Sequence, residues 1–282
     1  MLRVALALLE RMLPITQIME FAGEMTRRMR QQGLVAACTV SAARLGLECE
    51  FDLSDYAQKV LGAESVIVYG NHPTILTPFL VASAAGRDDM RFFIVDYVIR
   101  LIPSFGKYAL PLRVPAVRAR VEWRRGGIKR VISRRLARVF VSREARVDAR
   151  QANQRALSDG VRHLEQGGCV VIFPGGGGRE VERWYPGIGR LVEEVRGHRQ
   201  AHDVFLLPMH EDTRSEAHVY GAFRRLARGT SSRAGHRLHV RVRFAEPKRL
   251  QEFIPPDASC DEIIRKLQAD YEATYPRRQT DS

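Results

Sequence analysis

Short apolar runs that alternate with helical patterns constrain the fold of this chain more than any other feature. From residue 65 onward these runs are bounded by glycine or proline, and between them apolar residues recur at helical spacing. The runs are SVIVY (65–69), FFIV (92–95), CVVIF (169–173), VFLLP (204–208) and LHVRVRF (238–244). Strands that alternate with helices are typical of an α/β sheet covered on both faces. We therefore predict an α/β fold with a mixed central sheet flanked by helices.

Two helices of this domain are predicted from their own patterns. The first is stopped by Gly167-Gly168, and one face of it carries Ala152, Ala156, Leu157, Val161 and Leu164. The second begins at Ser259, because Ser259 and Glu262 have the spacing of a capping box. Its apolar residues are Ile263, Ile264, Leu267 and Tyr271. Both helices are expected to cover the sheet.

The first 30 residues predict an N-terminal amphipathic helical pair. Leu2 to Leu13 form a short helical stretch that Pro14 ends, and apolar residues then repeat opposite Arg27, Arg28 and Arg30. That apolar face consists of Ile15, Ile18, Met19, Ala22, Met25 and Met29. It either packs on the domain or lies in a membrane interface, because any surface helix has this pattern. We predict a membrane-associating helical segment over residues 1–55 and the α/β domain over 56–282.

Positive charge is concentrated in one segment of the chain. The net charge is +13, and between Arg113 and Arg150 13 basic residues stand against three acidic ones. Such a patch indicates an anionic partner: phospholipid, nucleic acid or a phosphorylated substrate. Apolar residues between Ile128 and Phe140 share a helical face, and such a basic amphipathic segment favours an anionic membrane surface. Residues 139–142 alternatively form a strand. We predict no nucleic-acid partner, because no binding fold and no interleaving of aromatic and basic residues accompanies the charge.

No disulfide framework, metal site or spanning helix is indicated. The four cysteines show no CxxC and no ligand spacing with histidine, so we expect neither disulfides nor a bound metal. No apolar run approaches the roughly 18 residues of a spanning helix, and the run at 4–9 is ended by Glu10 and Arg11. We predict a cytoplasmic protein that lies peripherally on the inner face of the membrane.

A glycine-rich loop follows the predicted strand at 169–173. Pro174 is followed by four glycines and then by Arg179, and several backbone N–H groups of such a run can approach an anion. Neither familiar nucleotide loop fits, because the third glycine of GxGxxG falls on Glu180 and no GK[ST] follows. The loop is therefore a phosphate-binding candidate, with a tight turn that binds nothing as the alternative.

Asn71-His72, just after the strand at 65–69, and Phe173-Pro174-Gly175 occur in an order that resembles the glycerophospholipid acyltransferase superfamily. That group includes the lysophosphatidic acid acyltransferases, whose first motif is NHxxxxD after a strand and whose third is FPEG. Residues 102–106 resemble the segment before the second motif, 140–144 resemble that motif, and 204–208 resemble the fourth. The resemblance covers about residues 55 to 275, and its specificity comes from the combination of motifs in order.

The resemblance implies an activity and a set of site residues. His72, beside Asn71, is the general base that takes the proton from an acceptor hydroxyl as this hydroxyl attacks an acyl thioester. Arg143 binds the phosphate of a glycerolipid-like acceptor, and a second anion or oxyanion contact comes from Gly175, Gly176, Gly177 and Arg179. The donor is acyl-CoA or acyl carrier protein as a co-substrate, and no cofactor is expected.

Two departures from the family pattern remove a carboxylate. The aspartate expected five residues after His72 is Thr77, and the glutamate of FPEG is Gly175. In the family the aspartate orients the imidazole and balances its charge. Thr77, in the catalytic position, can accept a hydrogen bond from the ring but cannot balance the charge of the imidazolium, so part of a general-base contribution of about 10²–10⁴-fold is at risk. Asp96, Glu180 and Glu182 are the nearby candidates for a substitute.

Alternatives remain for the protein and for its histidines. A catalytically weakened homologue that binds lipid or a partner protein is the alternative to an active acyltransferase. His72 is alternatively a residue at a helix start that bonds backbone groups. As a base near a helix N-terminus, His72 is expected to have a lowered pKa, because the positive end of the helix dipole disfavours the imidazolium. His202 and His210 are expected to be ordinary surface or loop histidines.

Overall fold

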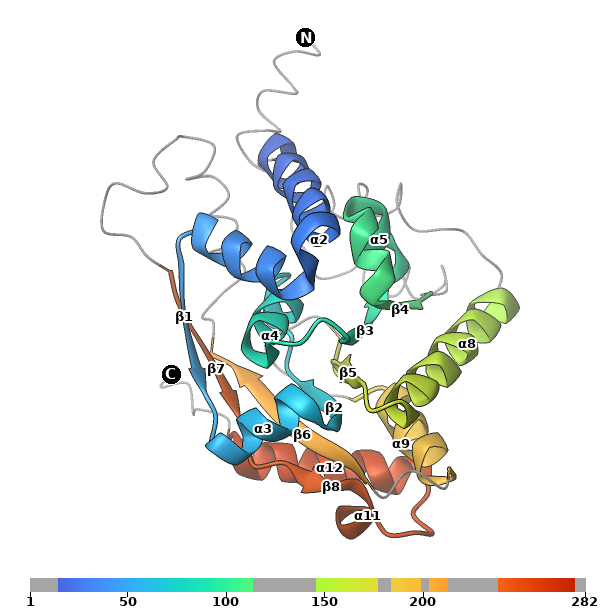
Figure 1. Ribbon diagram of the computed structural model, residues 1–282. Coiled ribbons are helices and arrows are strands. Elements are labelled where there is room, and N and C mark those ends of the chain that lie inside the picture. The colour runs from blue at the N-terminus through green and yellow to red at the C-terminus, as the bar shows by residue number, and fades with distance from the viewer. Residues whose placement is uncertain (1–14, 114–145, 177–183, 199–202, 213–237, 277–282) are drawn as a thin grey trace, which may run out of the picture.

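A central sheet of eight strands organises the computed structural model, which describes residues 15–113, 146–176, 184–198, 203–212 and 238–276 (Figure 1). Its strands are β1 (Leu47–Asp52), β2 (Ser65–Gly70), β3 (Arg91–Val95), β4 (Ala109–Leu112), β5 (Cys169–Ile172), β6 (Val204–Glu211), β7 (Leu238–Phe244) and β8 (Lys248–Arg249). The helices are α2 (Ile15–Arg44), α3 (Asp55–Ala63), α4 (Thr77–Ala85), α5 (Asp96–Leu101), the 3-10 helix η1 (Pro103–Tyr108), α8 (Arg146–Glu165), α9 (Gly187–Arg196), α11 (Leu250–Phe253) and α12 (Cys260–Thr274). All five apolar runs are strands, as predicted.

The sheet is mixed in direction. Its order is β1-β7-β6-β2-β5-β3-β4, with β8 paired to β6. Strands β6, β2, β5, β3 and β4 run parallel to one another, whereas β7 runs antiparallel to β6 and carries β1 parallel to itself. The carboxyl ends of β2, β5 and β6 therefore meet at one edge of the sheet, where open α/β sheets commonly place a site. The predicted mixed α/β sheet is confirmed.

Helices cover both faces of the sheet, which explains the apolar strands. In β2, Val66 and Val68 join a cluster with residues of α2, α3 and α4, whereas Ile67 and Tyr69 join one with α8, α9 and α12 (Figure 1). Side chains alternate across a strand, so a strand buried on both faces is apolar throughout. The β1 and β7 pair differs: one of its faces is buried, and the other carries ion pairs such as Arg241–Asp52 at 2.7 Å.

Helix α2 packs its predicted apolar face on the sheet domain. Ala22, Met25 and Met29 are buried, although Met19 keeps 51% of its surface exposed. The helix continues to Arg44 with a break at Gly33, whose φ of 87° lies in the left-handed region. A side chain there would collide with Asp88, because a Cβ atom would lie 2.6 Å from its carboxylate oxygen. The Asp88 carboxylate in turn accepts the N–H of Val35, at 3.0 Å, where the second half of the helix begins.

The N-terminal residues contribute to the central sheet as well as to α2. Strand β1 pairs with β7 over its whole length, from Leu47 with Leu238 to Asp52 with Arg243. The predicted helix over residues 2–13 lies outside the described residues, and a division of the chain at residue 55 stays a prediction. Within the described part of the chain, no helix combines the length and the hydropathy that a bilayer span requires.

Candidate active site

The turn that follows β2 is held against β6 by a glycine and an asparagine. A Cβ atom on Gly70 would lie 1.8 Å from the carbonyl oxygen of Met209, so only glycine allows this approach of the two backbones. Asn71 then donates to the carbonyl of Glu211 at 2.9 Å and accepts from its N–H at 2.7 Å. The amide thus continues the ladder between β2 and β6 by one residue, with only 2% of Asn71 exposed. His72 follows from this fixed point.

The ring of His72 is half-buried against the loop that follows β5. It stacks on Phe173, with ring centroids 4.7 Å apart and planes at 24°. Its Nδ1 is buried and has no hydrogen-bond partner among the residues that the structure describes. Burial lowers the pKa of His72 from 6.5 to about 4, and the Thr74 backbone opposes this only in part. The imidazole is therefore neutral at neutral pH, the form that a general base requires.

The cause of this lowered pKa differs from the expected one. Helix α4 begins only at Thr77, five residues after His72, and desolvation is the main contribution to the pKa shift. The expected direction of the shift is confirmed, whereas the helix dipole is not its principal cause. Taking a charged imidazolium out of water is costly, and this cost lowers the pKa of a buried histidine.

Thr77 is used within the turn itself. Its hydroxyl donates to the carbonyl of Thr74 at 2.8 Å and accepts the Thr74 N–H at 3.3 Å. These bonds close the turn before α4, and no hydrogen bond joins the threonine to the buried Nδ1 of His72. Asp96, one proposed substitute for the missing carboxylate, begins α5 and pairs with Arg100 at 3.2 Å. A catalytic role for Thr77 stays a prediction.

The glycine-rich loop begins beside the His72 turn. Gly176 has a φ of 70°, and its N–H donates to the carbonyl of Phe173 at 3.0 Å, which closes a tight turn just after β5. Because Phe173 stacks on His72, the first glycines lie close to the histidine in the fold although they are about 100 residues away in sequence. Gly177, Arg179, Glu180, Glu182 and Arg143 lie outside the described residues, so their predicted roles stay predictions.

A buried carboxylate near this turn was not predicted. Glu211 is only 2% exposed, and its carboxylate accepts a hydrogen bond from the Thr74 hydroxyl at 3.2 Å. The predicted strand stopped at Pro208, whereas β6 runs three residues further. Leu207, Met209 and Glu211 alternate onto one face of β6, so a continued strand pattern was the signal that would have found this glutamate.

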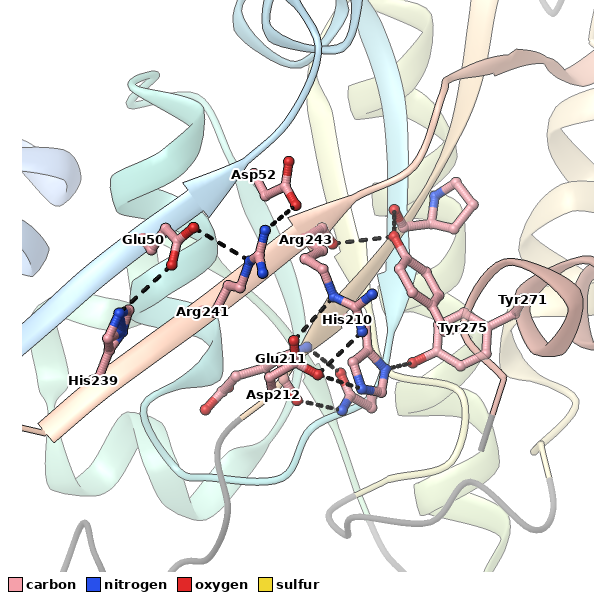
Figure 2. A network of polar contacts seen from close by, with 12 residues as sticks. Glu50, Asp52, His210, Glu211, Asp212, His239, Arg241, Arg243, Tyr271 and Tyr275 are labelled. Atoms are coloured by element: carbon pink, nitrogen blue, oxygen red, sulfur yellow. Dashed lines mark hydrogen bonds and ion pairs between the residues drawn. The ribbon is translucent and has the colours of Figure 1, made fainter. Parts of the chain in front are cut away.

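His210 points to the opposite face of β6, into a network of polar and aromatic side chains (Figure 2). Its Nδ1 lies 2.7 Å from the Tyr271 hydroxyl, and its Nε2 lies 3.4 Å from a carboxylate oxygen of Asp212. The ring also stacks on Tyr275 at 5.1 Å, and Asp212 makes two contacts of 3.0 and 3.1 Å with Arg243. The expectation of an ordinary surface or loop histidine is wrong here, because His210 is a half-buried strand residue. His202 lies outside the described residues.

Tyr271 connects this network to the His72 turn. Burial raises the pKa of Tyr271, and a hydrogen bond with the backbone of Asn71, the residue before His72, opposes this rise. A tyrosine with a raised pKa keeps its proton at neutral pH. The carboxyl end of β6 therefore supports the turn from both faces of the sheet.

No group of three or more metal-ligating side chains occurs within the described parts of the chain.

Comparison with known proteins adds a fold neighbour. No protein-family model matches the chain, and no curated protein matches it either. Among solved structures it is similar to the 1-acyl-sn-glycerophosphate (LPA) acyltransferase PlsC from Thermotoga maritima, with 13% sequence identity and a TM-score of 0.46. The match covers 93% of this chain and 80% of the PlsC chain. A likeness this distant carries no argument about the activity, which has to rest on the residues of the site.

Proposed function

We propose that this protein is an acyltransferase that moves a fatty acyl group from an acyl thioester to the hydroxyl of a phosphorylated glycerolipid-like acceptor, with His72 as the general base. The observation that carries the proposal is the neutral, half-buried His72 ring stacked on Phe173. This contact joins the Asn-His turn and the Phe-Pro-Gly loop, the two motifs on which the resemblance to acyltransferases depends, at the carboxyl edge of the sheet.

The chemistry uses the neutral imidazole as a proton acceptor. His72 takes the proton of the acceptor hydroxyl while the oxygen attacks the thioester carbonyl, and the resulting imidazolium returns a proton to the departing thiol. Backbone N–H groups of the glycine run starting at Gly175 would stabilise the oxyanion. Arg143 would hold the acceptor phosphate through its planar guanidinium, with Arg179 as a second anion contact.

An acyl-transfer assay tests this proposal directly. Purified protein is incubated with a lipid extract and with acyl-CoA or acyl carrier protein as the donor, and labelled products are quantified. His72→Ala should lower the turnover number by about 10²–10⁴-fold. His198→Ala is the matched control, because His198 pairs with Glu165 away from the His72 turn. Equal activity of wild type and His72→Ala would contradict the role of His72.

A catalytically weakened homologue that binds lipid or a partner protein is the second candidate. It is favoured by the pKa of His72, because an imidazole with a pKa of about 4 is a weak base. Thr77 and Gly175, at positions where the family has carboxylates, favour it too. A wild type inactive toward every acyl thioester, and still inactive as Thr77→Asp with Gly175→Glu, would support this candidate.

The site of action that we propose is the inner, cytoplasmic face of an anionic membrane. The support is the +10 excess of charge between Arg113 and Arg150. Binding to vesicles that contain anionic lipid should weaken as salt rises, because screening shortens the range of the attraction. Equal binding to neutral vesicles would contradict it. Deletion of residues 1–14, which leaves the buried side chains of α2 in place, tests whether the N-terminal segment adds an apolar, salt-resistant part to the binding.

A further inference from the structure

Glu211 contacts the residues on both sides of His72. Its backbone makes both hydrogen bonds with the Asn71 amide, at 2.7 and 2.9 Å, and its carboxylate accepts from the hydroxyl of Thr74, at 3.2 Å. The segment from 71 to 74 is thus held at each end by one residue that follows it by about 140 positions in sequence.

The carboxylate also lies on the same side of the sheet as the ring of His72. Glu211 alternates with Met209 and Leu207, which belong to the cluster beneath α2 and α4, and Phe173 packs against that same cluster. Glu211 is 2% exposed, so solvent screens its charge little.

Other described groups near the turn are engaged elsewhere. The Thr77 hydroxyl is bonded to the Thr74 backbone, and Asp96 pairs with Arg100. Asp212 follows Glu211 directly but points to the other face, where it pairs with Arg243. Of these three carboxylates, Glu211 is the one that accepts a hydrogen bond from the turn.

We propose that Glu211 is a positioning residue for His72, acting through Thr74 and Asn71, and that it takes the place of the aspartate that the family resemblance leads one to expect at position 77. When ionised, the Glu211 carboxylate would favour the imidazolium that forms as His72 accepts a proton. The hydroxyl of Thr74 transmits the position of the carboxylate to the backbone beside the ring. This inference rests on the proposed acyltransferase function for its catalytic consequence.

Two variants separate the charge from the hydrogen bond. Glu211→Gln removes the charge and keeps an acceptor oxygen for Thr74, whereas Thr74→Val removes the hydroxyl and nearly keeps the shape of the side chain. Each should lower the turnover number about tenfold without raising the Michaelis constant. The turnover number of the double variant should be no lower than that of the less active single variant. Glu194→Gln is the matched control, because Glu194 accepts from Ser158 at 3.1 Å in the opposite layer.

An NMR titration of the His72 ring gives a readout that needs no activity. In Glu211→Gln the pKa of His72 should fall below that of the wild type, since a charge that favours imidazolium has been removed. An unchanged His72 titration in both single variants, or purely additive losses that follow the melting temperature, would overturn the proposal and leave Glu211 with a packing role. Should Glu211→Gln fail to fold, Thr74→Val alone decides between these results.

The two proposals fail in different ways. An active wild type whose turnover number and His72 titration survive Glu211→Gln overturns the positioning role and leaves the acyltransferase proposal standing. An inactive wild type overturns the acyltransferase proposal, whereas a His72 pKa that still shifts in Glu211→Gln upholds the coupling between the two residues.

Discussion

His72 and His210 lie at the same edge of the sheet, just after β2 and near the end of β6, but on opposite faces. His210 has the Tyr271 hydroxyl at one ring nitrogen and Asp212 at the other, and it stacks on Tyr275 (Figure 2). His72 has an aromatic neighbour, Phe173, and a buried Nδ1 without a partner among the described residues.

His210 joins two elements through its ring contacts, whereas His72 is the histidine that we propose as the general base. The contacts of His210 tie α12 to β6, so removing the ring should cost stability. A buried polar atom without a partner costs folding free energy, and native proteins keep few of them. The unsatisfied nitrogen of His72 supports the proposed role of this histidine.

The largest expected effect is on the pH dependence of stability. The folded-state pKa of His72, about 4, lies below its unfolded value of 6.5, so the unfolded chain binds the extra proton first as the pH falls. His72 then costs up to about 3 kcal/mol of stability between pH 6.5 and pH 4, and nothing above pH 6.5. Urea unfolding across this range should show a shallower loss in His72→Gln than in wild type. A matching change in His210→Gln would break the distinction between the two histidines.

The next largest effect concerns the side-chain amide of Asn71, which joins the ends of β2 and β6 next to His72 and His210. Asn71→Ala leaves the buried backbone groups of Glu211 without their partners and should cost about 2 to 3 kcal/mol of unfolding free energy. Asn153 makes the same double contact with the backbone of Arg113, at 2.7 and 3.1 Å, at the end of β4. Asn153→Ala should lose stability only, whereas Asn71→Ala should lose acyl transfer beyond its loss of folded protein. Equal effects of the two variants on activity would show that the Asn71 hydrogen bonds serve the fold alone.

The network around His210 should give a smaller stability effect. Tyr271→Phe keeps the ring but removes the hydroxyl that lies 2.7 Å from Nδ1, which should cost about 1 to 2 kcal/mol. Tyr56→Phe is the control, because Tyr56 is 49% exposed and keeps its edge contact with Phe205. Chemical denaturation measures both. If the two variants were equally stable, the tyrosine would not hold α12 to β6 through this bond.

The smallest effect tests whether Glu211 already substitutes for the aspartate that the family resemblance leads one to expect at position 77. Thr77→Asp places a second negative charge near Glu211 and removes the hydroxyl proton that Thr77 donates to Thr74. We expect the turnover number to fall about tenfold, a barrier change of about 1.4 kcal/mol. Combining it with Glu211→Gln should restore part of the loss. A gain of tenfold or more in Thr77→Asp alone would instead mean that the position lacks a substitute.

Local patterns predicted most of the sheet. The runs over β2 and β5 are apolar because these strands are buried on both faces, and β7 alternates because one of its faces is exposed. The capping box of α12 is present, with the N–H of Ser259 bonded to the Glu262 carboxylate at 2.8 Å. Each of these signals lies within a few residues of the structure that it specifies, so no knowledge of distant segments was needed.

Two further features were not predicted: strand β1, although its apolar and acidic residues alternate with the period of a strand, and the break in α2. Strand β1 is rich in acidic residues, which are poor strand formers, and it exists because it pairs with β7 almost 200 residues later. Its partly buried side chains, Leu47, Cys49 and Phe51, alternate with exposed Glu48, Glu50 and Asp52. The break of α2 at Gly33 depends likewise on Asp88 from another part of the chain.

At the site, the sequence by itself determined that a histidine would follow a buried strand, near a glycine-rich loop, without the aspartate five residues later. Only the tertiary structure decided what surrounds that histidine. A glutamate near the end of a strand would ordinarily be assigned to solvent, yet Glu211 is buried, and Thr74, 137 residues away, donates a hydrogen bond to it. The solvation of a side chain, and with it the proton affinity of His72, is set by segments that are distant in sequence and meet only in the folded chain.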